Sequence, residues 1–507
     1  MAINSRKIAK NTVFLYARLL LILGVTLYSS RVILEVLGAS DYGLYYAIFS
    51  VIGLLSFLNG TLSAGTSRFL TFELGRGDAG MLKITFSTTL FSHILLAGII
   101  LLLGETIGLW YANHILVVPP DRTTAALIVY QISIISTVIS ILQVPFTAEI
   151  IAHEKMDVYA YLGIYEALAR LVVVYLLLHY GSDKLVYFAA LQLIVVFSVF
   201  LFYTYYSFSR FKEVSLKPKF DKKIFNSILR FSGWNIIANI SETLMSQGII
   251  MLYNLFFLPV VVAAQAIGNQ IAQAMMQFVN NVRQAVNPQV IKLYADRQYS
   301  ESQKLTFISA EYIFYLLLLI GIPCIMVMPK LLSIWLVEVP EYTVAFSRLI
   351  IAQQILGNFS AAFYTPMLAA NKLAKNSLAS VFLCIFQFAI LWLMFKIGFG
   401  PLWARYLGLF ACILFSFVIK PYILWKDIDY SLTDIYNCVL QCMKVLIPIV
   451  SFNIIIYIVI KQQTILQSCF VCLLSILSVI TISYLFMDKQ IKHRILFIIK
   501  KRLFGSI

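Results

Sequence analysis

The sequence predicts an all-α polytopic membrane protein with about 14 transmembrane helices. Of its 507 residues, 61% are hydrophobic and only 12% are charged, and that charged share is about half of what a soluble protein carries. The apolar residues arrive in blocks of about twenty or more, which is the length needed to cross a hydrocarbon core of about 30 Å. The blocks lack the alternation of barrel strands, and only helices or closed barrels span a bilayer.

The first apolar block follows three basic residues, Arg6, Lys7 and Lys10. It is too long for the apolar region of a signal peptide and no small-residue cleavage site follows it, so we expect a retained first helix. The predicted helices span residues 12–36, 43–65, 84–109, 123–150, 158–180, 184–206, 228–254, 259–285, 306–329, 342–369, 375–396, 402–424, 442–461 and 465–487.

The basic residues predict the orientation of these helices. Of the 39 Lys and Arg residues, 29 fall on the side that holds both termini and 6 on the other side. Such a bias marks the cytoplasmic side of a membrane protein, so we expect both termini in the cytoplasm. The net charge of +16 gathers at helix ends, which indicates orientation and not nucleic-acid binding. The remaining four lie inside predicted helices: Arg18, Arg31, Arg170 and Arg348.

Two short motifs recur and indicate an internal repeat. The sequence KITF at 83–86 returns as KLTF at 304–307, and A-x-x-K-M at 152–156 returns as A-x-x-K-L at 369–373. A parallel two-fold repeat is a common transporter plan. We therefore predict two six-helix bundles plus two extra C-terminal helices. The predicted domains are an N-terminal bundle (1–206), a basic cytoplasmic linker (207–227), a C-terminal bundle (228–424), and helices 13–14 with a basic cytoplasmic tail (425–507).

The motifs of catalytic and metal sites are absent or incomplete. No G-x-x-x-x-G-K-[ST] phosphate loop occurs, and no large loop is available for a catalytic domain. His153-Glu154 lacks a second His four residues later, and Asp427-Ile428-Asp429 lacks a surrounding nucleotide-binding domain. Cys469 and Cys472 lie in an apolar helix without His or acidic neighbours. We therefore predict no enzymatic activity, no cofactor and no metal site.

The arginines inside helices are the first candidate site. An Arg at the bilayer centre costs about 2.5–3.5 kcal/mol on insertion scales, so it persists where it faces a cavity or a partner. Arg18, Arg170 and Arg348 predict a cationic cavity for an anionic group. Glu166 stands four residues before Arg170, the spacing of an ion pair on one helical face. That pair is either structural or a proton switch.

Two helices carry polar stripes, the second candidate site. The residues recur every three or four positions, so each stripe occupies one helical face. A hydrated groove for a hydroxyl-rich ligand is favoured over interhelical hydrogen bonds, which contribute only about 0.6 kcal/mol each. The stripes are Gln265, Asn269, Gln273, Gln277, Asn280 and Gln284 on one helix, and Ser232, Asn235, Asn239, Glu242 and Ser246 on the other.

The N-terminal region resembles a known family. Asn11-Thr12, Ser30-Arg31 and the segment L-G-A-S-D-Y-G-L-Y at 37–45 are similar to the start of Wzx-type polysaccharide flippases of the multidrug/oligosaccharidyl-lipid/polysaccharide exporter superfamily. The resemblance implies a V-shaped pair of bundles in the bacterial inner membrane. These would flip undecaprenyl-pyrophosphate-linked oligosaccharide by alternating access, for capsule or O-antigen. The implied partners are that lipid-linked substrate, membrane lipids, and a polysaccharide polymerase with other export proteins.

Chemistry then assigns roles to the candidate residues. Guanidinium forks match phosphate geometry, so Arg18, Arg170 and Arg348 are predicted to bind the pyrophosphate, with Arg68 and Arg283 loading it from the inner mouth. Glu166 or Glu242 is predicted to couple transport to H+ or Na+. The predicted glycan groove comprises Asn235, Asn239, Gln265, Asn269, Gln273 and Gln277.

Three alternatives remain open. A cation-coupled multidrug exporter of the same fold would need buried carboxylates, yet arginines outnumber acids within the helices. A membrane polymerase or ligase would need a long outer loop with paired Arg and His, but the loop at about 110–122 offers only Arg122 and His114. A structural scaffold would not require arginines within the membrane.

Overall fold

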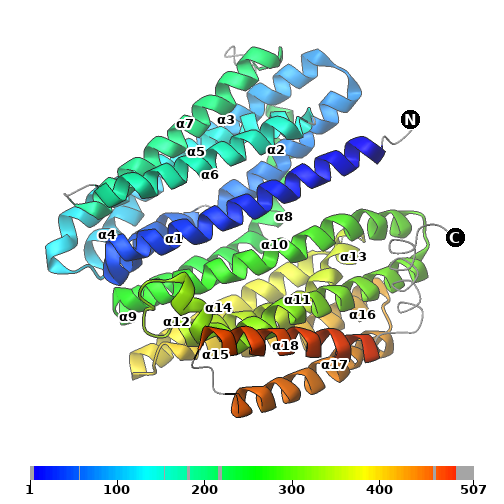
Figure 1. Cartoon of the computed structure of the whole chain (residues 1–507). Helices are drawn as coiled ribbons and strands as arrows, with labels where there is room; N and C mark the ends of the chain where they lie inside the picture. The colour runs from blue at the N-terminus through cyan, green and yellow to red at the C-terminus, as the bar shows by residue number, and fades with distance from the viewer. Residues whose placement is uncertain are drawn as a thin grey trace. The chain divides into compact units, whose positions relative to one another are not determined.

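The computed structural model describes residues 5–55, 57–153, 155–179, 183–214, 220–370, 372–460 and 464–486, which form helices and connecting turns with no strand among them (Figure 1). Ten of the described helices are long and apolar enough to cross a membrane. The prediction of an all-α polytopic membrane protein is confirmed.

Most of the predicted transmembrane segments coincide with one helix or with a run of short helices. The first two instead share the helix Ser5–Leu55, and the second continues into the helix Phe57–Arg76. Several runs are interrupted by a single wider turn, at Gly104–Gly108, Leu244–Gly248 and Phe415–Ile419. The helices are α1 (Ser5–Leu55), α2 (Phe57–Arg76), α3 (Ala79–Leu103), α4 (Leu109–His114), α5 (Thr123–Ala152), α6 (Met156–His179), α7 (Lys184–Arg210), α8 (Lys222–Thr243), α9 (Ile249–Phe256), α10 (Pro259–Ala295), α11 (Tyr299–Trp335), α12 (Thr343–Phe359), α13 (Tyr364–Ala369), α14 (Ala374–Ile397), α15 (Leu402–Leu414), α16 (Lys420–Ile428), α17 (Leu432–Val459) and α18 (Ile465–Phe486).

The first two predicted helices meet at a kink inside α1. Gly38 has φ 74° and ψ 167°, and the helix continues on both sides of it. A positive φ is readily adopted by glycine because it has no Cβ. The connection expected over 37–42 is therefore this one residue, and the second segment begins directly after it.

Two contacts near this kink explain residues of the segment 37–45. A Cβ on Gly43 would lie 1.9 Å from the carbonyl oxygen of Pro259, so only glycine allows the two backbones to approach this closely. The Asp41 carboxylate accepts a hydrogen bond of 2.6 Å from Arg122, whose other terminal nitrogen lies 3.1 Å from Asp183. One arginine thus ties the kink to the N-cap residue of α7.

The helices group into two compact units. Unit 1 comprises Met1–Ala266, Trp335–Glu341 and Ser380–Pro401, and unit 2 comprises Ile267–Ile334, Tyr342–Ala379 and Leu402–Ile507. In unit 1, α5 packs against α7, α3 and α2, and α1 packs against α6. In unit 2, α12 packs against α15, and α17 packs against α18. The predicted domain boundaries at 206, 227 and 424 stay a prediction.

The backbone repeats the same turns in both halves of the chain. Gly77 and Arg297 both have positive φ, and their N–H groups donate to Leu74 and Tyr294 at 3.2 and 3.1 Å, an offset of 220 residues. The second pair of turns also matches: Lys155 N–H donates to Ile150 at 3.0 Å and Lys372 N–H to Met367 at 2.9 Å, an offset of 217. The recurring sequence motifs therefore mark recurring backbone structure.

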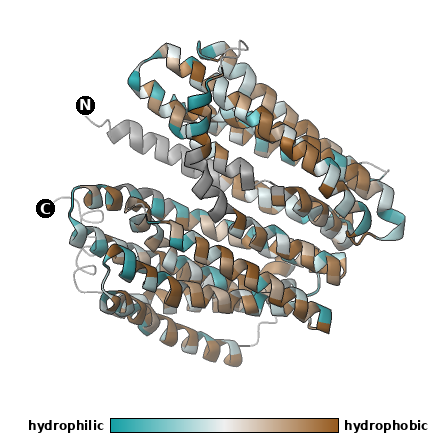
Figure 2. Ribbon diagram, turned by 180° about the vertical axis from the view of Figure 1, so that it is seen from behind, coloured by the Kyte–Doolittle hydropathy of each residue, from teal (hydrophilic) through white to brown (hydrophobic). Residues whose placement is uncertain are grey.

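The outer faces of the helices are apolar. Large side chains such as Leu466 (81% exposed) and Phe382 (71% exposed) have no covering neighbour in their unit. Figure 2 shows brown, hydrophobic residues along the middle of many helices and teal, hydrophilic residues near their ends. Such a surface suits hydrocarbon and not water.

Candidate functional site

In unit 1 the predicted Arg170 lies in a small polar network on α6. Its guanidinium donates to Glu166 at 2.8 Å through a terminal nitrogen and at 3.3 Å through Nε, and to the Gln192 amide oxygen of α7 at 3.0 Å. The Arg170 and Glu166 side chains are 43% and 40% exposed. The same-face ion pair that the sequence spacing predicted therefore exists, and its partner balances the charge of Arg170.

In unit 2 the predicted Arg348 lies where three helices meet. Its Nε donates to the Ile325 carbonyl of α11 at 3.1 Å. Its guanidinium carbon lies 5.5 Å from the ring centroid of Tyr457 on α17, a distance at which a cation and an aromatic face attract. Arg348 thus faces the first of the two extra C-terminal helices.

The most buried cation of unit 2 is Lys420, at the start of α16. Its side chain is only 6% exposed and lies within an apolar span, 403–428. Its Nζ donates to the Ser360 carbonyl at 2.8 Å and to Ser360 Oγ at 3.3 Å, and lies 5.3 Å from the Phe415 ring centroid. No carboxylate among the described residues lies within ion-pair distance of this ammonium. Burying a charge without a counterion costs several kcal/mol.

A second cation, Arg283 of α10, lies within electrostatic reach of Lys420 and of Tyr364. Arg283 is half-buried, and its Nε is shielded from solvent without a hydrogen-bond acceptor in the described part of the chain. One turn further along α10, Asn287 accepts a hydrogen bond of 2.8 Å from Thr365. We call Arg283 and Lys420, with Ser360, the cationic pair of unit 2.

The remaining predicted residues divide into three groups. On α10 the polar stripe is buried at Gln265, half-buried at Asn269, and exposed at Gln273 and Gln277. Arg68 is exposed on α2. The side chains of Arg18, Asn235, Asn239 and Glu242 lie outside those that the structure describes.

Lys420 is the residue that sequence reasoning missed, because it was counted with the inner loop that follows the predicted span 402–424. Arg405, counted with an outer loop, is likewise a buried residue of α15 with 7% exposure. The available signal was a Lys surrounded by apolar residues on both sides, F-V-I-K-P-Y-I-L at 417–424. Such a Lys is expected to face the interior of a bundle.

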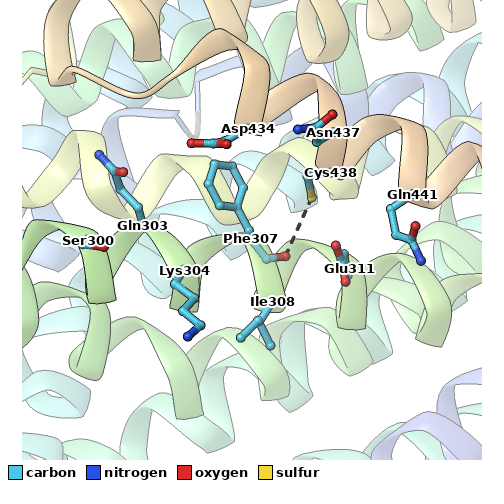
Figure 3. Close-up of a pocket in the computed structure, with 10 residues that line it drawn as sticks. All are labelled: Ser300, Gln303, Lys304, Phe307, Ile308, Glu311, Asp434, Asn437, Cys438 and Gln441. Atoms are coloured by element: carbon cyan, nitrogen blue, oxygen red, sulfur yellow. Dashed lines mark hydrogen bonds between the residues drawn. The ribbon is translucent and has the colours of Figure 1, made fainter. Parts of the chain in front are cut away.

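A pocket of about 550 Å³ lies in unit 2 between the N-terminal ends of α11 and α17, which the sequence predicts to lie on the cytoplasmic side (Figure 3). Its charged lining residues are Lys304, Glu311 and Asp434. Cys438 of α17 contacts the Phe307 carbonyl of α11 at 3.9 Å across it. Two carboxylates against one ammonium make this pocket unfavourable for an anion, in contrast to the cationic pair.

No protein-family model matches the sequence, and no curated protein is a significant match. Solved structures are similar. An inward-facing multidrug resistance MATE family transporter of the MOP superfamily aligns with TM-score 0.67 and 13% identity over 81% of this chain and 96% of its own. Lipid II flippase MurJ, in an inward closed conformation, aligns with TM-score 0.63 and 15% identity over 94% of this chain and 98% of its own. This chain shares the fold of these two solved proteins. A MATE protein in a straight conformation shares that fold too, with TM-score 0.59 and 14% identity over 84% of this chain and 97% of its own.

Proposed function

We propose that this MOP-fold protein is a flippase for a lipid-linked anionic saccharide. The observation that carries the proposal is the cationic pair of unit 2: Lys420 is 6% exposed and hydrogen-bonds to Ser360, with Arg283 close by and no carboxylate within ion-pair distance in the described residues. A buried ammonium and a half-buried guanidinium are stabilised by an anion, and phosphate is an anion that both groups bind. A pyrophosphate-linked lipid supplies that group.

The proposed identity of the substrate follows from the resemblance of the N-terminal region to Wzx-type flippases. The substrate is undecaprenyl-pyrophosphate-linked oligosaccharide for capsule or O-antigen, moved by alternating access across the bacterial inner membrane, with both termini cytoplasmic. The polymerase and other export proteins would act next on the flipped product. The similarity to lipid II flippase MurJ, which spans 94% of this chain, supports a lipid-linked substrate.

The predicted residues take defined parts in this proposal. Arg283 and Lys420 bind the pyrophosphate in unit 2. Arg348, which lies against α17 and about 18 Å along α12 from Ser360, stays assigned to the pyrophosphate from the sequence alone. In unit 1, Arg170 is a separate candidate for binding an anionic group when Glu166 releases it, which makes Glu166 the candidate for H+ or Na+ coupling. Arg18 and Arg68 remain assigned to binding and loading. Gln273 and Gln277 of α10 are exposed and suit the hydrated glycan.

The second candidate is a cation-coupled multidrug exporter, since MATE transporters share the fold with a TM-score of up to 0.67. An organic cation needs buried carboxylates at its site. In unit 2 the half-buried Arg283 of α10 and the buried Lys420 of α16 carry positive charges, which disfavours this candidate.

The test compares the transport of two classes of substrate by the protein in proteoliposomes. The parent protein is expected to flip a fluorescent polyprenyl-pyrophosphoryl oligosaccharide and not to move a cationic dye. Arg170→Ala, Arg348→Ala and Lys420→Met should each reduce flipping, while Lys426→Met, on the same helix but exposed and 3.2 Å from Tyr422, should not. Export of the dye with no lipid flipping would establish the exporter instead.

A further inference from the structure

A second cluster of chemically active side chains lies in unit 1. His153 follows the end of α5, Glu149 lies one turn before it, and Glu213 lies in the segment after α7. The His153 Nε2 atom is 3.2 Å from Glu149 Oε1 and 2.5 Å from Glu213 Oε1. One ligand atom from each residue lies within 4.8 Å of the other two.

The burial of this cluster indicates that it has a ligand. The Glu149 side chain is completely shielded from solvent, and its Oε2 has no hydrogen-bond partner among the described residues. A buried carboxylate oxygen left unpaired is costly. Glu213 is 11% exposed and His153 is 23% exposed, so the cluster has an open side through which an ion can enter.

The chemistry of the three groups selects the ion. Two carboxylates and one imidazole bind first-row divalent metals, with bonds of about 2.0–2.2 Å, and leave a fourth position for water. An imidazole ligand disfavours Mg²⁺ and Ca²⁺, which prefer oxygen alone. The ring of Phe211 stacks on His153 with centroids 4.1 Å apart, which fixes the imidazole plane. We propose that Glu149, His153 and Glu213 form a binding site for a Zn²⁺-type divalent metal.

Such a site would join two segments that are distant in sequence. Glu149 and His153 belong to the end of α5, whereas Glu213 lies 60 residues beyond His153, in the predicted linker 207–227. A bound metal would therefore fasten the start of the linker to α5. The neighbouring charged groups described there, Arg210, Lys155 and Lys212, are exposed and do not fill the site.

Zinc binding to the full-length protein in detergent tests the proposal directly. Protein stripped with a chelator is titrated with Zn²⁺ in competition with a chromogenic chelator, and with Mg²⁺ as a comparison. The parent should bind one Zn²⁺. Glu213→Gln and Glu149→Gln should each weaken zinc affinity about tenfold or more, because each removes a charged ligand. Zinc affinity in His179→Asn should match that of the parent, because His179 is exposed and contacts only its own helix.

A second readout keeps the test valid if Glu149→Gln fails to fold. Zn²⁺ should slow tryptic cleavage after the exposed Lys212 in the parent and not in Glu213→Gln, whose substitution lies in a connecting segment. Equal zinc affinity and equal cleavage rates in the parent and Glu213→Gln would overturn the proposal. Neither result depends on which substrate the protein moves, so this inference and the proposed function fail separately.

Discussion

Arg170 of unit 1 and Lys420 of unit 2 are both cations in apolar helical spans, but their surroundings differ. Arg170 is about 43% exposed and donates to a carboxylate at 2.8 Å and an amide at 3.0 Å. Lys420 is 6% exposed, and in the described part of the chain it donates only to the carbonyl and hydroxyl of Ser360, with a second cation near it. The first arrangement is complete without a ligand. The second has no counterion among the described residues, and in our proposal an anion completes it.

The comparison teaches that the sign and pairing of a charge within a helix bundle indicate a ligand site better than the presence of a charge does. A paired and half-exposed Arg contributes little to stability and is free to exchange partners. An unpaired buried ammonium lowers stability unless something binds to it. Function is therefore expected to respond most strongly to substitutions in unit 2.

The largest effect is expected for the double substitution Lys420→Met with Arg283→Met. Each charged hydrogen bond to a phosphate contributes about 1.5–3 kcal/mol, so loss of both should weaken binding of a prenyl pyrophosphate about 100-fold or more. Calorimetric titration measures the change. The control is Lys426→Met with Arg297→Met, which removes the same number of charges from exposed positions.

The next effect concerns stability. Lys420→Met should raise the free energy of unfolding by about 1 kcal/mol or more in the absence of ligand, since an apolar side chain of similar length replaces a desolvated charge. Denaturant titration in detergent checks this. A clear loss of stability would show that the Ser360 hydrogen bonds already satisfy the ammonium, and the contrast with Arg170 would then disappear.

A smaller effect is expected for Arg283→Lys. The charge remains, but the planar fork that matches two phosphate oxygens is lost. Affinity for a pyrophosphate lipid should fall about fivefold, and affinity for the corresponding monophosphate should fall less. If both ligands lose affinity equally, Arg283 acts only as a distant charge. The exposed Arg297→Lys provides the matched control.

The smallest effect is expected in unit 1. Glu166→Gln removes the carboxylate that competes for Arg170, so affinity for the anionic lipid should rise about two- to fivefold, in line with the modest strength of exposed ion pairs. Binding measured beside Gln192→Ala, which removes the neutral partner, separates loss of competition from general loosening of α6. A fall in affinity with Glu166→Gln would mean that Glu166 positions Arg170 for binding.

The fold was predictable from the sequence because the length and apolar composition of a segment identify it as a membrane helix. The predicted spans lie largely within helices. The recurring turns at Gly77 and Arg297 each lie shortly before one copy of the recurring motif at 83–86 and 304–307. The Glu166–Arg170 pair was predictable because it is local, four residues apart on one face. The form of the connection between the first two predicted helices was not predictable. The sequence predicted a turn, whereas the chain bends at the single residue Gly38.

The rest of the site depends on tertiary structure. Lys420 lies near the end of a predicted span, and only packing shows that it points at Ser360 of another helix and not at water. The Glu149–His153–Glu213 cluster combines residues 60 positions apart, so the incomplete His153-Glu154 motif gave no indication of it. The roles of Arg18, Asn235, Asn239 and Glu242 stay predictions.

The most direct test of the central claim is equilibrium binding of a short prenyl pyrophosphate to three purified proteins: the parent, Lys420→Met and Lys426→Met. Both substitutions remove one positive charge from the same helix, and only Lys420 is buried. The parent and Lys426→Met should bind with similar affinity, and Lys420→Met should bind about tenfold or more weakly. Equal affinity of all three proteins would contradict the assignment of the anion site to the cationic pair of unit 2.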